Sequence, residues 1–215
     1  DFAELCEKNK INFIGPSGKS MDLCGDKMRC KAAMLEAKVP TVPGSPGLVK
    51  DEDDAEKIAN DIGYPVMLKS VYGGGGRGIR IVTNDKELRE GFESVTGESI
   101  AAVGKSAIIV EKFLEKTRHI EYQFARDTHG NAVHIFEREC SIQRRNQKLI
   151  EQTPSPIMDE ETRARIGELV VNAAHAVDYT NLGTAEFLRA DNGEFYFIEI
   201  NARLQVEHPI TEFVS

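Results

Sequence analysis

The sequence lacks tryptophan and has no apolar run near the length that crosses a lipid bilayer, so we expect no membrane-spanning segment. No charged leader followed by an apolar stretch is visible, and no secretion signal is expected. Positive charge is also scarce, because 27 Lys and Arg stand against 35 Asp and Glu, a formal net charge of −8. Nucleic-acid binding normally needs a basic surface, so this balance argues against it.

Cysteine is scarce as well. The four cysteines, at positions 6, 24, 30 and 140, show no C-x-x-C spacing and no nearby pair of histidines. Zinc sites and disulfide scaffolds are therefore disfavoured, and buried thiols in a reducing compartment are expected. This indicates a cytoplasmic protein, or one of the mitochondrial matrix if the source is eukaryotic.

The chain length of 215 residues suits one large domain or two small ones. The first residues predict a helix, and the chain stops at Phe213-Val214-Ser215 without a closing element. We therefore expect a piece of a longer polypeptide.

Two regions differ in pattern. Residues 42–114 alternate short strands and helices around a glycine run, which predicts a small α+β lid. Residues 115–215 predict long strands joined by turns, with one helix over 159–178. Because hairpins make antiparallel sheets, the predicted fold class is α+β, an antiparallel sheet with packed helices plus the lid.

The region before the lid predicts a short strand at 12–14 and a helix from Asp26 to Ala37. Asp26 is a suitable N-cap. The buried side of this helix is expected to hold Met28, Ala32 and Leu35, together with Cys24. Lys27 is expected to point away from that side.

The stretch 199–208 (E-I-N-A-R-L-Q-V-E-H) carries the most chemistry. If it is extended, alternate side chains point to opposite faces. One face is then polar, with Glu199, Asn201, Arg203, Gln205 and Glu207. The other is apolar, with Ile200, Ala202, Leu204 and Val206. The polar face could bind a hard metal ion and an oxyanion. The alternative is a strand with a solvated polar face.

Glu186 lies on the strand that should pair with the one ending at Glu199. Across such a hairpin the two carboxylates could hold one or two magnesium ions, and Asn201 would add a neutral oxygen ligand.

The run of glycines at 73–76 follows a strand that ends near Lys69. Glycines free the backbone N–H groups to wrap a polyphosphate, and Lys69 would neutralise charge. The pattern is neither Walker A nor a dinucleotide fingerprint. A flexible hairpin tip is the alternative.

A basic, amide-rich run at 141–152 predicts a further strand. Alternation would place Gln143, Arg145 and Gln147 on one face and Arg144, Asn146 and Lys148 on the other. In an acidic protein this indicates an anionic ligand. The alternative is the surface of an edge strand, where such charges discourage pairing.

Taken together, these motifs resemble biotin carboxylases of the ATP-grasp superfamily over nearly the whole chain. The segments that carry the resemblance are the glycine loop after Lys69 and the runs 111–114, 118–121, 143–148 and 199–208. The E-x-N-x-R-x-Q-x-E-H run is specific, whereas the glycine loop alone is not. The resemblance implies that ATP phosphorylates bicarbonate to carboxyphosphate, and that the carboxyl group then passes to N1 of biotin.

The resemblance also implies four parts. Residues 1–25 would end an N-terminal subdomain, 26–41 would form a connecting helix, and 42–114 would form the lid. Residues 115–215 would form the sheet with the metal and bicarbonate site, incomplete at its end.

The implied residue roles fall into three groups. Nucleotide contacts would come from Lys27, Lys69, Gly73, Gly74, Gly75, Gly76, Gly78, Glu111, Lys112, Leu114, His119, Gln143, Asn146 and Leu188. Metal ligands for Mg²⁺ or Mn²⁺ would be Glu186, Glu199 and Asn201. Bicarbonate would be bound by Lys148, Arg203, Gln205 and Val206, with Glu207 as the base and Lys148 and Arg203 as further catalytic residues.

The implied partners are a biotin carboxyl carrier protein or domain and a carboxyltransferase component, in an oligomeric parent enzyme. Three positions, Tyr72, Asn146 and Gln152, depart from the common family pattern. Two other functions stay open: the ATP-binding domain of a carbamoyl-phosphate synthetase, and a non-catalytic nucleotide-binding module. The final carboxyl acceptor also stays open.

Overall fold

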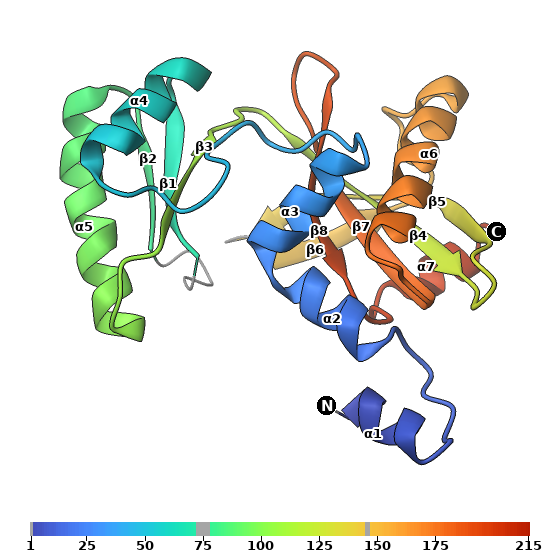
Figure 1. Cartoon of the computed structure of the whole chain (residues 1–215). Coiled ribbons are helices and arrows are strands. Elements are labelled where there is room, and N and C mark those ends of the chain that lie inside the picture. The colour runs from blue at the N-terminus through green and yellow to red at the C-terminus, as the bar shows by residue number, and fades with distance from the viewer. Residues whose placement is uncertain (1, 72–77, 145–146) are drawn as a thin grey trace. The chain divides into compact units, whose positions relative to one another are not determined.

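The computed structural model describes residues 2–71, 78–144 and 147–215 (Figure 1). The chain divides into two compact units. One runs from Val42 to Glu115, and the other combines Asp1–Thr41 with Lys116–Ser215. Each unit is described by itself. The four-part division expected from the sequence stays a prediction, since the structure separates two units only.

The unit of residues 42–115 contains a three-stranded antiparallel sheet in the order β2-β1-β3. Its strands are β1 (Val66–Ser70), β2 (Ile79–Val82) and β3 (Ile108–Lys112), and its helices are α4 (Glu52–Ile62) and α5 (Asp85–Val103). Asp51 and Asn84 cap the two helices by accepting hydrogen bonds from the N–H groups of Asp54 and Glu87. Both helices share one apolar core with the sheet, centred on Leu68 and Val110.

The other unit is built on a five-stranded antiparallel sheet in the order β6-β5-β4-β7-β8. Its strands are β4 (Arg118–Arg126), β5 (Ala132–Arg144), β6 (Gln147–Gln152), β7 (Asn181–Arg189) and β8 (Phe195–Asn201). Its helices are α1 (Phe2–Lys8), α2 (Gly18–Gly25), α3 (Lys27–Glu36), α6 (Glu160–Ala176) and α7 (His208–Glu212). The hairpins and the antiparallel sheet expected from the sequence are therefore present.

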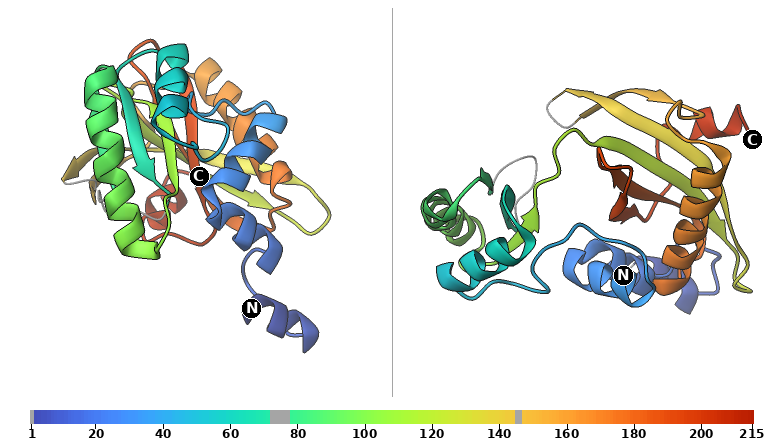
Figure 2. Two further views of the ribbon diagram at one scale, coloured as in Figure 1. Left: turned by 60° about the vertical axis from the view of Figure 1, so that its left-hand side comes forward. Right: turned by 90° about the horizontal axis from the view of Figure 1, so that it is seen from above.

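The two faces of this sheet differ in character. On β4, Ile120, Tyr122 and Phe124 are fully buried in an apolar core with residues of α3 and α6. Figure 2 shows both helices on the same side of the sheet. The alternate residues Glu121 and Gln123 point to the other face, yet they are also fully buried. Buried polar side chains need partners, so this second face is where chemistry is expected.

Two expectations about the first 40 residues are wrong. Residues 12–14 form no strand, and Ile14 is 84% exposed. Helix α3 is capped by Asp26 as expected, but it buries Cys30 and Met34 while Leu35 is 55% exposed. The helix packs against α6 and β8 with the side that carries Cys30 and Met34, which is next to the side expected from the sequence.

The run at 141–152 is not one strand. The chain reverses between Arg144 and Gln147, which face each other across β5 and β6, as do Gln143 and Lys148. The expected division of this run into two faces is therefore wrong. Arg145 and Asn146 lie outside the described residues.

The run at 199–208 is extended only as far as Asn201, where β8 ends. Beyond it, Leu204 is 54% and Val206 is 93% exposed, whereas Gln205 is 6% exposed. The expected apolar face is therefore wrong. The chain leaves the strand because the Gln205 side chain turns inward and accepts a hydrogen bond from the buried Arg138.

All four cysteines are buried and free, as expected. No helix in the described ranges has both the length and the apolar character that a membrane crossing requires.

Candidate active site

Lys148 on β6 is the centre of a cluster of carboxylates on the polar face of the five-stranded sheet. Its ammonium group donates hydrogen bonds to Glu121 Oε2 on β4 and to Glu186 Oε1 on β7, the latter at 2.9 Å. Glu207 Oε1 lies 3.6 Å from the same nitrogen. Although burial would lower the pKa of Lys148, Glu121 and Glu186 raise it above its ordinary value. Lys148 is therefore a permanent cation shared by three acidic groups.

Glu186 is the most heavily engaged carboxylate of the cluster. Besides Lys148, its Oε1 accepts a hydrogen bond of 2.8 Å from the Asn201 amide, and its Oε2 lies 2.8 Å from His119 Nε2. Burial alone would raise the pKa of Glu186, but His119 and Lys148 lower it to about 2. Glu186 is consequently ionised at any physiological pH.

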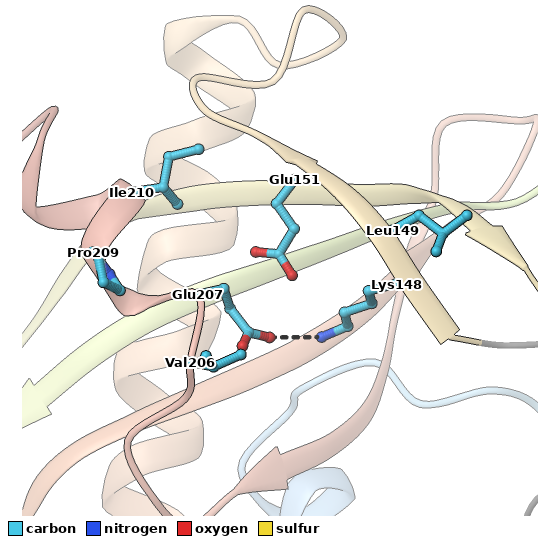
Figure 3. A pocket seen from close by; sticks show the side chains of 7 residues that line it. All are labelled: Lys148, Leu149, Glu151, Val206, Glu207, Pro209 and Ile210. Atoms are coloured by element: carbon cyan, nitrogen blue, oxygen red, sulfur yellow. Dashed lines mark ion pairs between the residues drawn. The ribbon is translucent and has the colours of Figure 1, made fainter.

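Next to Lys148 lies a pocket of about 340 Å³ (Figure 3). It is lined by Lys148, Leu149, Glu151, Val206, Glu207, Pro209 and Ile210. Figure 3 shows Lys148 and Glu151, both on β6, directed toward Glu207, which lies on the segment before α7. A small anion in this pocket would meet an ammonium and a carboxylate together, the combination needed to bind an oxyanion and remove its proton.

Glu151 has an unusual environment for a carboxyl group. Its Oε2 lies 3.6 Å from Arg138 Nε but has no hydrogen-bond partner. Burial, and the nearby charges of Glu121 and Glu207, raise the pKa of Glu151 to about 7. Its protonation therefore changes within the physiological pH range.

Glu151→Gln is expected to stabilise the full-length protein at pH 8 but not at pH 5. The pKa of Glu151 is higher in the folded than in the unfolded state, so its cost to stability appears as the pH rises toward 7 and persists above it. After allowance for solvent screening, the gain should be on the order of 1–2 kcal/mol. Thermal unfolding at both pH values measures it, with the exposed Glu168→Gln as the control for charge. An equal effect at both pH values would contradict the assignment.

The metal ligands assigned by resemblance lie together on two neighbouring strands. Glu186 faces Glu199 directly across β7 and β8, and Asn201 bonds to Glu186. Carboxylate and amide oxygens are the ligands that Mg²⁺ prefers, so these residues fit such an ion. Ligand atoms of His119, Glu121 and Glu186 also lie within 4.8 Å of one another. On that side of Glu186, however, Lys148 already supplies the positive charge.

The other residues assigned to bicarbonate differ in exposure. Gln205 is buried, whereas Arg203 and Val206 are exposed. The Arg203 guanidinium contacts only the neighbouring carbonyl of Leu204, at 3.2 Å, among the hydrogen bonds described. The structure thus places Val206 and Glu207 at the Lys148 pocket and Arg203 just before it in the chain.

The residues assigned to nucleotide are distributed over both units. In the unit of residues 42–115, Lys69 pairs with Glu111 at 2.7 Å, and the Lys112 ammonium binds two backbone carbonyls. In the other unit, His119 faces Leu188 across β4 and β7, Gln143 Nε2 lies 3.2 Å from His119 Nδ1, and Lys27 is exposed. Leu114 is half-buried and Gly78 is buried. Gly73, Gly74, Gly75, Gly76 and Asn146 lie outside the described residues.

Three charged residues of the site have no role predicted from the sequence: the buried Glu121 and Arg138, and the half-buried Glu151. Glu121 and Arg138 are fully buried and form an ion pair of 2.6 Å. The sequence signal for the buried pair is Glu121 itself, a charged residue between the apolar Ile120 and Tyr122. It points to an ion pair only once the strand register places Arg138 opposite Glu121.

Comparison with known proteins gives a consistent family. Residues 26–215 match the family described as "Carbamoyl-phosphate synthase L chain, ATP binding domain". A biotin carboxylase of Nostoc sp. is 50% identical over 214 residues, which are 100% of this chain and 48% of that protein. The 2-oxoglutarate carboxylase small subunit of Hydrogenobacter thermophilus is also 50% identical, again over 100% of this chain, but over 45% of its own length. The chain thus spans about half the length of these curated relatives.

Solved structures agree with the sequence comparison. The biotin carboxylase domain dimer of the Hydrogenobacter thermophilus 2-oxoglutarate carboxylase, in complex with MgADP, ADP and bicarbonate, has a TM-score of 0.89 at 50% identity and covers 100% of this chain and 47% of its own. A biotin carboxylase–β-γ-ATP complex from Campylobacter jejuni has a TM-score of 0.90 at 48% identity, over 100% of this chain and 48% of its own. The similarity to biotin carboxylases expected from the sequence is confirmed. The chain belongs to the carbamoyl-phosphate synthase L chain, ATP binding domain family and has the α+β ATP-grasp fold of biotin carboxylase domains.

Proposed function

We propose that this chain is the ATP- and bicarbonate-binding part of a biotin carboxylase. It would phosphorylate bicarbonate with ATP to form carboxyphosphate, and it would then carboxylate N1 of biotin on a carrier protein or domain. The observation that carries the proposal is the placement of Glu207 3.6 Å from the Lys148 ammonium at the wall of one pocket.

Glu207 is the proposed general base. Bicarbonate is a weak nucleophile, so a carboxylate must take its proton as it attacks the terminal phosphate. Lys148 and Arg203 would hold the anion in line and offset its repulsion with the triphosphate. Because Lys148 is already fixed by Glu121 and Glu186, its ammonium needs little rearrangement when the anion binds.

The remaining ligands are assigned by the donor sets described above. Glu186, Glu199 and Asn201 would hold Mg²⁺ or Mn²⁺, which neutralises phosphate charge when bound. Lys27, Lys69, the glycine loop and His119 would contact the nucleotide phosphates and sugar. Glu111, Lys112, Leu114 and Leu188 would surround the base. The MgADP and bicarbonate in the related 2-oxoglutarate carboxylase domain support this set of ligands.

The proposed partners follow from the reaction. Carboxybiotin needs a biotin carrier and a carboxyltransferase component, and the related domain that crystallised as a dimer supports an oligomeric parent. Four free buried thiols support a reducing compartment, which we propose to be the cytoplasm or, in a eukaryote, the mitochondrial matrix.

A second candidate comes from the family description itself, which names carbamoyl-phosphate synthase. Such an enzyme also phosphorylates bicarbonate, so the Lys148 pocket suits both. The names of the relatives with about 50% identity favour biotin carboxylation.

The experiment uses the full-length protein that contains this chain. With Mg-ATP, ¹⁴C-bicarbonate and free biotin, label is expected in carboxybiotin, and ADP formation should require bicarbonate. Label in carbamoyl phosphate when ammonia replaces biotin would favour the second candidate. Nucleotide binding without any bicarbonate-dependent hydrolysis would indicate a non-catalytic module and refute the proposal.

A further inference from the structure

Arg138 on β5 is completely buried, although arginine is almost never buried without partners. Its Nε lies 3.6 Å from Oε2 of Glu151, a residue that lines the Lys148 pocket. We propose that Arg138 is a positioning residue of the carboxylation site. Its guanidinium fixes Glu121 and the segment 205–211, and thereby sets the places of Lys148 and Glu207. The inference rests on the function proposed above for this pocket.

The guanidinium has no donor left for a ligand. Its Nε donates to Glu121 Oε1 at 2.6 Å. Its Nη1 donates to Gln123 Oε1 at 3.0 Å and to Thr211 Oγ1 at 2.9 Å. Its Nη2 donates to Gln205 Oε1 at 2.9 Å and to Thr184 Oγ1 at 3.4 Å. A guanidinium carries five N–H groups, and each one has an acceptor here. Arg138 therefore acts through its neighbours and does not contact substrate.

Two of these acceptors flank the proposed base. Gln205 and Thr211 lie on either side of Glu207 in the chain, in a segment that belongs to no strand. Its own backbone bonds are local, from His208 N–H to the Gln205 carbonyl and from Ile210 N–H to the Glu207 carbonyl, both at 3.2 Å. Such bonds shape the turn but do not attach it to the sheet. Among the described residues, the attachment comes from Arg138, from His208 Nδ1, which lies 3.3 Å from Gln123 Oε1, and from the ion pair of 3.6 Å between Glu207 and Lys148.

Besides its hydrogen bonds to Gln205 and Thr211, Arg138 also acts on Lys148 electrostatically, through Glu121. Glu121 receives Arg138 on one oxygen and Lys148 on the other. Without the guanidinium, Lys148 would be the nearest cation for Glu121, Glu186 and Glu207 together. Its ammonium would then be drawn toward Glu121, which has no exposed surface, and away from Glu207. Arg138 thus keeps part of the Lys148 charge available to the pocket.

Lysine cannot replace this group, because an ammonium carries three donors on one atom and cannot reach acceptors on three sides. In the full-length protein, Arg138→Lys is expected to lower kcat/KM for bicarbonate by about 10–100-fold, the cost of misplacing a reacting group by about 1 Å. Nucleotide affinity should stay within about twofold, since no donor of Arg138 is free for a ligand. Amide hydrogen exchange across residues 206–212 should become faster.

Arg163→Lys is the matched control. Arg163 binds Glu137 through two bonds of 2.8 Å, but it lies on α6, away from the pocket. This control should lose thermal stability and keep its kcat/KM. If both variants lose the same stability and both keep kcat/KM, Arg138 is only structural and the proposal is wrong. It is equally wrong if nucleotide affinity falls in parallel with kcat/KM.

Thr211→Val keeps the proposal testable if Arg138→Lys does not fold. It preserves side-chain shape and removes one acceptor, so a loss of about 3–10-fold in kcat/KM for bicarbonate is expected, with faster exchange at 206–212. Unchanged exchange and unchanged kcat/KM in this variant would overturn the proposal. If the unaltered protein shows no bicarbonate-dependent ATP hydrolysis, the proposed function fails, and amide exchange in the same variants still decides whether Arg138 fixes the segment.

Discussion

Glu207→Gln is expected to lower bicarbonate-dependent ATP hydrolysis by the full-length protein by about 10²–10⁴-fold, the usual contribution of a general base. The amide keeps the size of the side chain but cannot accept the proton of bicarbonate. Because Glu207 lies in the pocket with Lys148 and is no part of the proposed metal site, affinity for the Mg-nucleotide should remain near that of the unaltered protein. Steady-state hydrolysis with and without bicarbonate, combined with nucleotide titration, measures both quantities.

Glu212→Gln is the matched control for this variant. Glu212 lies in the same short helix but is exposed and pairs with His208 at 3.1 Å, outside the pocket. Its replacement should leave hydrolysis unchanged. Hydrolysis by Glu207→Gln at the normal rate would show that another group takes the proton, and Glu151 would be the next candidate because it lines the same pocket.

Lys148→Met is expected to remove activity and to destabilise the protein strongly. Glu121, Glu186 and Glu207 would lose the cation they share, and breaking a buried ion pair in this way typically costs about 3–5 kcal/mol. The loss should be smaller at pH 5 than at pH 8, since carboxylates without their cation become easier to protonate. Thermal unfolding at the two pH values measures the destabilisation and its pH dependence, and bicarbonate-dependent ATP hydrolysis by the full-length protein measures the loss of activity.

Lys86→Met is the control for the loss of a lysine charge. Lys86 is exposed on α5, where its Nζ lies 4.0 Å from Glu90 Oε1, so its replacement should change the unfolding temperature little. If Lys148→Met unfolds at the same temperature as the unaltered protein at pH 8, the carboxylate cluster does not depend on this cation. The electrostatic description of the site would then be wrong.

The hairpin of β7 and β8 could be predicted from the sequence because both strands and their turn are adjacent in the chain. The register that puts Glu199 opposite Glu186 depends on an irregularity as well. Phe187 faces Phe197, so an unbroken register would place Ile198 opposite Glu186, but a shift between Glu186 and Phe187 places Glu199 there. The alternating pattern predicts the hairpin and does not contain that shift.

The path after Asn201 could not be predicted in the same way. Alternation favoured a continued strand with Leu204 and Val206 buried, yet both are exposed. The hydrogen bonds that turn Gln205 inward and anchor Thr211 come from Arg138, 67 and 73 residues away in the chain. No local pattern contains that information.

Lys148 shows a third situation, in which the resemblance assigned the residue to a bicarbonate pocket but the single strand expected to carry it is two strands in the structure. The basic run gave no sign of the reversal that separates β5 from β6. Lys148 therefore pairs with Gln143 on the neighbouring strand and does not continue the strand that carries Gln143. Glu121 was missed because a glutamate in an alternating strand usually indicates a solvated face.

The strand order β6-β5-β4-β7-β8 has a consequence for how the site comes into being during folding. Residues 118–152 make a meander of three strands and residues 181–201 make a hairpin, and the two pair along β4 and β7. Lys148 and Glu121 belong to the meander, and Glu186, Glu199 and Asn201 to the hairpin, so neither half of the chain can assemble the carboxylate cluster around Lys148 alone. Closing this seam requires contacts between residues far apart in the chain, and the entropy cost of closing the intervening loop makes such contacts slow to form. A ligand that bridges the seam would bind only the joined form and hold it closed by mass action.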